Sequence, residues 1–389
     1  MREVVIAGVG QIPVGEHWEL SLRNISARAV QATRKDAPGL EPESMYIGNL
    51  MAPVASHQAN LGALVTDNTF LEGIEGSTVE AGEASGAAAF RLAYLAVASG
   101  WVDVAMALGI EKYTDLAGEN QDDPAYQVLD YDYELMNGLT PAGQAGLLLQ
   151  RYLYENPEAQ RSVFGTFPMI AHRNAVNNPN AMYRKAIKAE SYARAQMVSA
   201  PLNIFDVAPY ADGAAALILT TPEKAAHLHH PLVRVIGSHV AIDTLALHDR
   251  QDMLSFRAAG ISLEQACHQA GILPDDVDFF ELDDAYSIYA VLTLEAAGFA
   301  PRGEGWKLAL DDTLTLGGDM PISTMGGHKA RGYPLGASGT YQLVEAVLQL
   351  RGQAGANQIK DARLALVQNL GGPAATAVTH VLEKMPGNY

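Results

Sequence analysis

Short runs of apolar residues alternate along the chain with longer segments in which apolar residues recur at helical spacing. The short runs predict buried strands, and the longer segments predict helices. In the first half, the predicted strands are residues 4–7, 44–47, 104–108 and 214–219, and the predicted helices are 22–33 and 87–98. In the second half, strands are predicted at 233–236, 279–282 and 364–368, and helices at 263–270, 288–297 and 341–350. This alternation predicts an α/β fold.

The two halves of the chain share one order of elements. An Ala-Ser-Gly sequence ending at Gly86 opens a helix, which is followed by Gly100 and a strand. A second Ala-Ser-Gly sequence, ending at Gly339, opens a helix that is followed by Gly352 and a strand. This order favours an internal duplication, with halves at 1–225 and 226–389, over a chance likeness of two helices.

A polar, aromatic segment at about 116–200 interrupts the first half. We expect an inserted loop domain over one face, because long insertions in α/β proteins often contact ligands. Five basic side chains of this segment either meet ligand phosphates or form a solvated face: Arg173, Arg184, Lys185, Lys188 and Arg194.

Composition narrows the class of protein. The chain has 389 residues, of which 48% are hydrophobic and 18% charged, as expected of a packed globular protein. Its net charge of −18 disfavours nucleic acids and anionic membranes as partners, since both need a basic surface. No apolar run reaches the ~18 residues of a membrane span, and the N-terminus reads as a strand rather than a signal peptide. A cytoplasmic location is expected.

The sequence contains a single cysteine, Cys267. It therefore has no intrachain disulfide and no cysteine-based metal site, and we predict no metal centre. The surrounding sequence predicts a packed thiol on a helix that ends at Gly271.

Two segments carry the most specific patterns. Residues 80–86 read Glu-Ala-Gly-Glu-Ala-Ser-Gly, and residues 326–339 read Gly-Gly-His-Lys-Ala-Arg-Gly-Tyr-Pro-Leu-Gly-Ala-Ser-Gly. Four further segments complete a set of six in chain order: 7–15, 109–115, 177–181 and 212–216. The set resembles the thiolase family, particularly its sterol-carrier-protein type, over almost the whole chain. The resemblance implies a duplicated thiolase fold, with two βαβαβαββ halves in αβαβα layers, which usually forms a dimer.

The resemblance breaks at the positions that carry the family's chemistry. The nucleophilic Cys of the family is replaced by Glu83, and the His of its His-Asp/Glu-Ala-Phe motif by Asp283. The His of Gly-His-Pro, which activates the Cys, is replaced by Tyr333, and a nearby Asn by Ser323. Joint replacement of a nucleophile, its base and an oxyanion donor indicates that Cys-dependent acyl transfer has been lost.

Glu83 has two interpretations. We expect it at the N-terminus of a buried helix, where backbone N–H groups and the helix dipole stabilise a charged carboxylate. A carboxylate stabilised in this way is a weak base, so the sequence favours an internal anion that fills the former oxyanion site. The alternative is a working general base.

Other polar side chains could form acid/base pairs with it: Asp283, Asp284, Tyr286, His328 and Tyr333. Tyr333 with Asp283 is the first candidate pair, although Tyr333 could equally fill the space of the absent His. His328 is more simply interpreted as a histidine of an exposed loop.

The resemblance also implies the ligand, which is coenzyme A or acyl-CoA, with no tightly bound cofactor. The basic side chains of the insertion could meet its phosphates. Gly326, Gly327 and Gly336 would let the backbone approach a pantetheine arm, or they serve a tight turn.

Three functions remain open from the sequence. The first is a thiolase-like protein that binds acyl-CoA but no longer performs Cys-dependent acyl transfer. The second is a non-catalytic subunit of a complex with an active thiolase paralogue or a zinc-ribbon/OB-fold protein, which are partners that the resemblance implies. The third is a lyase that acts on a CoA ester by retro-aldol cleavage or decarboxylation.

Overall fold

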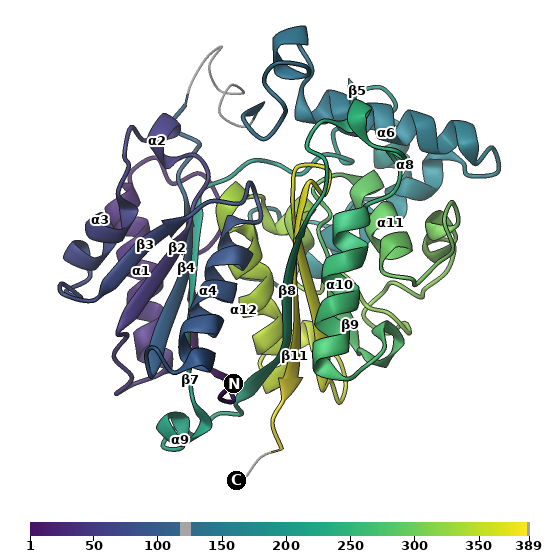
Figure 1. Ribbon diagram of the computed structural model, residues 1–389. Helices are drawn as coiled ribbons and strands as arrows, with labels where there is room; N and C mark the ends of the chain where they lie inside the picture. The colour runs from purple at the N-terminus through teal and green to yellow at the C-terminus, as the bar shows by residue number, and fades with distance from the viewer. Residues whose placement is uncertain (117–125, 387–389) are drawn as a thin grey trace.

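The structure is a computed structural model that describes residues 1–116 and 126–386 (Figure 1). Its main sheet has nine strands in the order β3-β2-β4-β7-β1-β8-β11-β10-β9. The strands of the first half are β1 (Val5–Gln11), β2 (Ser44–Gly48), β3 (Glu75–Val79), β4 (Val104–Glu111) and β7 (Gly213–Thr220). Those of the second half are β8 (Val233–Ile242), β9 (Phe279–Glu281), β10 (Leu364–Gly371) and β11 (Thr376–Lys384).

Both halves have the same sheet topology. β2 runs parallel to β4, which is antiparallel to β7, which is antiparallel to β1. In the second half, β9 runs parallel to β10, which is antiparallel to β11, which is antiparallel to β8. A bridge between Phe280 and Ile322 takes the place that β3 has in the first half. The predicted duplication is confirmed.

Helices cover and separate the two half-sheets. α1 (Leu22–Asp36) packs on the first half-sheet from outside, and α10 (Arg257–Ala270) on the second. Between the halves lie α4 (Ser85–Ser99) and α12 (Ser338–Arg351), which pack on each other (Figure 1). Among the described strands, the half-sheets are joined between β1 and β8, where Val5 pairs with Arg234 and Ile6 with Val233. The α/β layers therefore follow the predicted order.

Close glycine contacts hold the two central helices together. A Cβ built on Gly86 would lie 2.9 Å from the carbonyl oxygen of Gly336, and one on Gly339 would lie 2.7 Å from the amide nitrogen of Ala87. The two repeated Ala-Ser-Gly sequences thus meet at the centre of the molecule. The short helices α2 (Ala52–Ala55), α3 (Leu61–Asn68) and α9 (Pro222–Ala225) lie in the first half.

The insertion is more regular than the loops that we predicted. It contains α6 (Pro141–Glu155), α7 (Thr166–Ala175), α8 (Ala189–Ala193) and a small hairpin of β5 (Met197–Ser199) and β6 (Leu202–Asn203). α6 lies over α11 (Ser287–Ala296), where the hydroxyl of Tyr152 donates to Glu295 at 2.6 Å (Figure 1). The insertion is therefore a helical cap that rests on the second half.

No helix among the described residues has both the length and the apolar character needed to cross a bilayer. Cys267 is buried on α10, as predicted, and burial raises the pKa of its thiol to about 11.

Candidate active site

Glu83 lies in the turn that connects β3 to α4. The turn is fixed by Gly82, whose φ is +61°, and by Ser85, whose hydroxyl accepts the N–H of Ala81 at 2.9 Å. The Glu83 carboxylate reaches across to the second half, where it accepts the N–H of Gly372 at 2.7 Å. Only 8% of Glu83 is exposed. Its carboxylate is thus held by the turn between β10 and β11 rather than by its own helix.

The predicted stabilised anion at Glu83 is wrong. Burial raises the pKa of this carboxyl to about 7, and the backbone N–H groups of Gly372 and of Glu83 itself oppose the rise only in part. The nearby charge of Asp283 adds to the rise. A carboxyl with this pKa accepts and returns a proton near neutral pH, as a general base must.

Asp283 is the second buried carboxylate of the site and lies just after β9. Its Oδ1 accepts the N–H of Ala285 at 3.0 Å, and its Oδ2 accepts the side-chain amide of Asn369 at 3.1 Å and the N–H of Leu370 at 3.2 Å. These backbone and amide donors fix its orientation beside Glu83.

Tyr333 completes the group that the sequence placed together. Its backbone pairs with Pro209 and Ala211, so that its ring stacks 6.1 Å from the ring of Tyr210. Burial raises the pKa of the Tyr333 phenol well above its usual value, and the charges of Glu83 and Asp283 raise it further. The phenol therefore stays protonated and is a hydrogen-bond donor.

Two more tyrosines of the site were not singled out from the sequence, namely Tyr210 and Tyr289. The hydroxyls of Tyr210 and Tyr286 are hydrogen-bonded to each other, and the rings of Tyr286 and Tyr289 lie 4.8 Å apart. Burial raises the pKa of all three phenols, and Glu83 is among the charges that raise each one. The spacing of Tyr286 and Tyr289 at the start of α11 was a usable signal, because residues three apart share a helix face.

Asp284 and His328 form the layer behind these groups. Asp284 accepts the N–H of His328 at 2.6 Å and the hydroxyl of Ser323 at 3.1 Å. His328 is fully buried, and its ring stacks 4.8 Å from that of Tyr333. The expected exposed loop is wrong at this point, because residues Gly327–Arg331 form a buried helical turn that packs on α7.

The three predicted glycines are buried against protein atoms. A Cβ on Gly326 would lie 2.7 Å from that of Ala175, and one on Gly327 would overlap the Oδ2 of Asp284. A Cβ on Gly336 would lie 2.7 Å from the amide nitrogen of Leu50. This geometry favours the tight-turn interpretation of these residues over contact with a pantetheine arm.

A cavity of about 450 Å³ approaches the site from the insertion. It is lined by His172, Tyr183, Val198, Ile204, Phe205, Val207, Ala208, Pro209 and Lys329. Pro209 also accepts the N–H of Tyr333 at 2.9 Å, so the cavity wall contacts the tyrosine group. The five basic side chains of the insertion that the sequence singled out are exposed: Arg173, Arg184, Lys185, Lys188 and Arg194.

The described residues contain no cluster of three or more His, Cys, Asp or Glu side chains arranged for a metal ion. The groups gathered around Glu83 are carboxyls and neutral phenols. Such a set can move a proton and donate hydrogen bonds to a developing oxyanion, but the position of the family's Cys offers no thiol to accept an acyl group as a thioester.

Comparison with known proteins places the chain in a family. Residues 240–384 match the family described as thiolase C-terminal domain-like. An acetyl-CoA acetyltransferase of Methanothermobacter thermautotrophicus is 36% identical over 387 residues, which are 99% of this chain and 100% of that protein. The benzoylsuccinyl-CoA thiolase subunit BbsB of Thauera aromatica is 30% identical over 384 residues, which are 95% of each chain.

A solved structure is also similar over its full length. The Ltp2-ChsH2(DUF35) aldolase superposes with a TM-score of 0.85 at 25% identity, covering 98% of each chain. With its duplicated sheet and its full-length relatives, the chain belongs to the thiolase superfamily.

Proposed function

We propose that this protein is a carbon–carbon lyase that acts on a β-hydroxyacyl-CoA by retro-aldol cleavage. The observation that carries the proposal is Glu83. At the position of the family's nucleophile, it has a pKa of about 7 and lies among buried, protonated tyrosines. A site of this kind exchanges protons and does not hold an acyl group.

In the proposed reaction, ionised Glu83 removes the proton from the β-hydroxyl of the substrate. The Cα–Cβ bond then breaks, and Cβ becomes the carbonyl carbon of an aldehyde or ketone. The electron pair of the broken bond stays with Cα and forms the enolate of the shorter acyl-CoA. Tyr333 and Tyr286 donate hydrogen bonds to the enolate oxygen. Protonated Glu83 returns its proton to Cα, which releases the acyl-CoA and restores the carboxylate.

The pocket favours an alcohol substrate over a carboxylate. Decarboxylation would bring a substrate carboxylate close to Glu83 and Asp283, and like charges in a buried site repel strongly. The similarity to a solved aldolase supports the same choice. The acetyltransferase and thiolase names of other relatives describe chemistry for which this chain lacks the Cys.

The acyl-CoA would enter along the cavity lined by Phe205, Val207 and Lys329. This cavity has an apolar wall suited to a pantetheine arm, and the exposed side chains of Arg184, Lys185 and Lys188 lie on the adjacent part of the insertion. These cations would pair with the CoA phosphates at the protein surface. No tightly bound cofactor is needed for the proposed reaction.

We also propose that the active form contains a second type of subunit. The aldolase of similar structure is named as a pair of proteins, and BbsB is named as a subunit. A zinc-ribbon/OB-fold protein fits this role better than an active thiolase paralogue, because this chain has proton-transfer groups of its own.

The test is an assay of C–C cleavage with a series of β-hydroxyacyl-CoA esters, with and without the co-purified partner. We expect turnover that falls at least 100-fold in Glu83→Gln and in Tyr333→Phe. The matched controls, Glu80→Gln and Tyr154→Phe, change exposed side chains and should retain activity. Absence of turnover in the complex would favour a non-catalytic subunit, and full activity of Glu83→Gln would overturn the proposed mechanism.

A further inference from the structure

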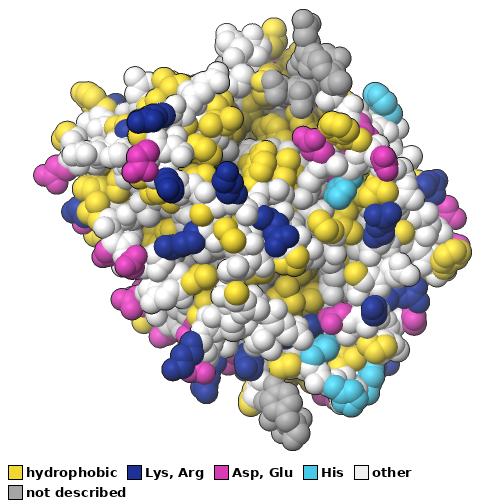
Figure 2. Space-filling view, turned by 180° about the vertical axis from the view of Figure 1, so that it is seen from behind, with side chains coloured by type: hydrophobic (Ala, Val, Ile, Leu, Met, Phe, Trp, Pro, Cys, Tyr) yellow, Lys and Arg dark blue, Asp and Glu magenta, His cyan; other side chains and the backbone are white. Residues whose placement is uncertain are grey.

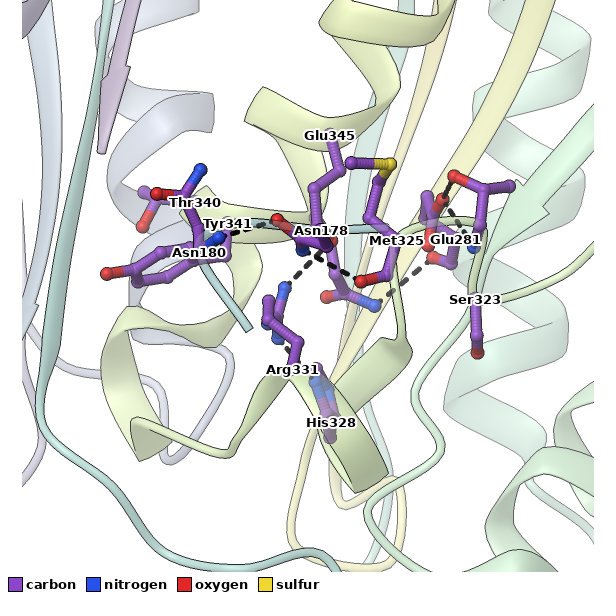
Figure 3. Close-up of polar contacts among 12 residues, drawn as sticks. Asn178, Asn180, Glu281, Ser323, Met325, His328, Arg331, Thr340, Tyr341 and Glu345 are labelled. Carbon is purple, nitrogen blue, oxygen red and sulfur yellow. Dashed lines mark hydrogen bonds and ion pairs between the residues drawn. The ribbon is translucent and has the colours of Figure 1, made fainter. Parts of the chain in front are cut away.

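A buried chain of polar contacts runs from α12 to the site. In this chain, which we call the Arg331 network, Glu345 accepts the Nη1–H of Arg331 at 2.9 Å, and the Nη2 of Arg331 lies 2.8 Å from the Nδ1 of His328 (Figure 3). The Nε2 of His328 lies 3.3 Å from the Oδ2 of Asp283. Each of these four side chains is at most 1% exposed.

The contact between Arg331 and His328 fixes which nitrogen of the imidazole carries the proton. A guanidinium has only donors, so the Nδ1 of His328 must be the acceptor and carries no hydrogen. The ring is therefore neutral, with its proton on Nε2. Glu345 holds the guanidinium from its other side, so that it cannot turn away from the ring.

The Nε2–H of His328 is a buried donor directed at the active site. It has no aligned hydrogen-bond acceptor, although the Oδ2 of Asp283 is 3.3 Å away. A buried donor without a partner lowers the stability of the folded protein. Asp284 also contacts His328 by accepting its backbone N–H, and Tyr333 stacks on its ring. At this separation of 3.3 Å, the Oδ2 of Asp283 is within reach of the donor.

We propose that His328 is a positioning residue, which the Arg331 network locks in the Nε2–H tautomer to hold Asp283 and the ring of Tyr333. Positions 283 and 333 have no histidine in this chain. His328, five residues before Tyr333, would provide an imidazole in their place. The expected effect of His328 on turnover rests on the proposed lyase function. The assignment of its tautomer rests only on the contact with Arg331.

The tautomer is measured directly by ¹⁵N NMR of histidine side chains at pH 7 in the protein as purified, with His328 assigned by its absence in His328→Gln. We expect one protonated nitrogen, Nε2, coupled to the ring in the pattern of a neutral imidazole. A proton on Nδ1, or on both nitrogens, would overturn the proposal whether or not the protein is a lyase.

Two variants separate positioning from simple packing. His328→Phe keeps a ring to stack on Tyr333 but removes the donor, and His328→Gln places an amide N–H near the position of Nε2. We expect kcat to fall about 10- to 100-fold in the Phe variant with KM within about twofold, and to recover largely in the Gln variant. Equal kcat in both variants, each folded by circular dichroism, would contradict the positioning role.

Discussion

Single residues determine where protons are held in this pocket. Burial raises the pKa of Glu83 to about 7, although the backbone N–H groups of Gly372 and of Glu83 itself oppose the rise. The neighbouring phenols stay protonated because burial and the carboxylates oppose their ionisation. One group therefore accepts a proton and several donate hydrogen bonds. This division fits enolate chemistry and does not need a covalent intermediate.

The raised pKa of Glu83 predicts a pH-dependent gain in stability for Glu83→Gln. The pKa rises from 4.5 to about 7 on folding, so stability is complete below pH 4.5 and is lost as the pH rises through 7. Gln stays neutral throughout, and we expect Glu83→Gln to be more stable by up to about 3 kcal/mol at pH 8 and equal at pH 4. Urea unfolding at both pH values measures this.

Glu80→Gln is the matched control, because Glu80 lies in the same turn but is exposed. Its stability should follow that of the wild type at both pH values. A loss of stability in Glu83→Gln at pH 8 would mean that the Glu83 carboxylate is a stabilised anion after all.

The single thiol predicts resistance to alkylation. Cys267 is buried on α10, and its pKa is raised to about 11, so little thiolate forms at pH 7.5. We expect iodoacetamide to leave both the protein mass and any turnover unchanged over an hour. Inactivation that is absent in Cys267→Ser would place the thiol in the reaction.

Sequence reasoning singled out residues that the fold brings together, but it misjudged two of their environments. Glu83, Asp283 and Tyr333 come together as predicted, since the flanking motifs define their positions in the fold. The state of Glu83 depends on Gly372, nearly 300 residues away in sequence, and the burial of His328 depends on α7 of the insertion. Neither contact is encoded in local sequence.

At the scale of elements, the two central helices connect the halves of the site. α4 follows Glu83, and α12 carries Glu345 of the Arg331 network, so their packing sets the distance between the groups from each half. Glycines at both helix starts permit this close approach, as shown by the contacts that a Cβ on Gly339 would make with Ala87.

This packing predicts that Gly339→Ala is destabilising. Its Cβ would lie 2.7 Å from the amide nitrogen of Ala87, and backbone there cannot move aside easily. We expect a loss of about 1–3 kcal/mol in the free energy of unfolding, measured by urea denaturation. Gly15→Ala is the control, because no atom lies within 4 Å of the added methyl group. Equal stability of the two variants would show that the helix contact is loose.

The element types were predictable for most of the buried apolar runs. All seven predicted strands and all five predicted helices are present, whereas β3 and β11 were not predicted. β3 reads Glu-Gly-Ser-Thr-Val and lies exposed at the sheet edge, so it lacks the apolar pattern of a buried strand. The helices of the insertion were missed because polar and aromatic residues mask their spacing.

At the scale of the whole molecule, the face seen in Figure 2 carries charges of both signs. Basic, acidic and apolar side chains are interspersed on the face seen in Figure 2. The net charge of −18 opposes non-specific binding to polyanions by electrostatic repulsion. If the protein binds CoA as proposed, we expect the local basic segment of the insertion, rather than the overall charge, to contact its phosphates.

The free edge of β3 predicts a homodimer. This strand pairs only with β2 among the described strands, and its other edge, beside exposed Trp101, is open to a second copy. We expect a dimer by light scattering. Ser77→Lys, which puts two like charges at the centre of an antiparallel pair, should shift it to monomer, whereas Glu72→Lys outside the strand should not. A dimer unaffected by Ser77→Lys would place the interface elsewhere.

Proton exchange at the α-carbon of an acyl-CoA is the most direct measurement of the central claim. The protein, with its partner when one co-purifies, is incubated with propanoyl-CoA in D₂O, and deuterium at Cα is followed by mass spectrometry. We predict that the wild type and Cys267→Ser exchange the Cα proton for deuterium and that Glu83→Gln does not. We also predict that no acylated protein forms. A covalent acyl-enzyme, or exchange that persists in Glu83→Gln, would contradict the claim that Glu83 performs proton transfer where relatives use a nucleophile.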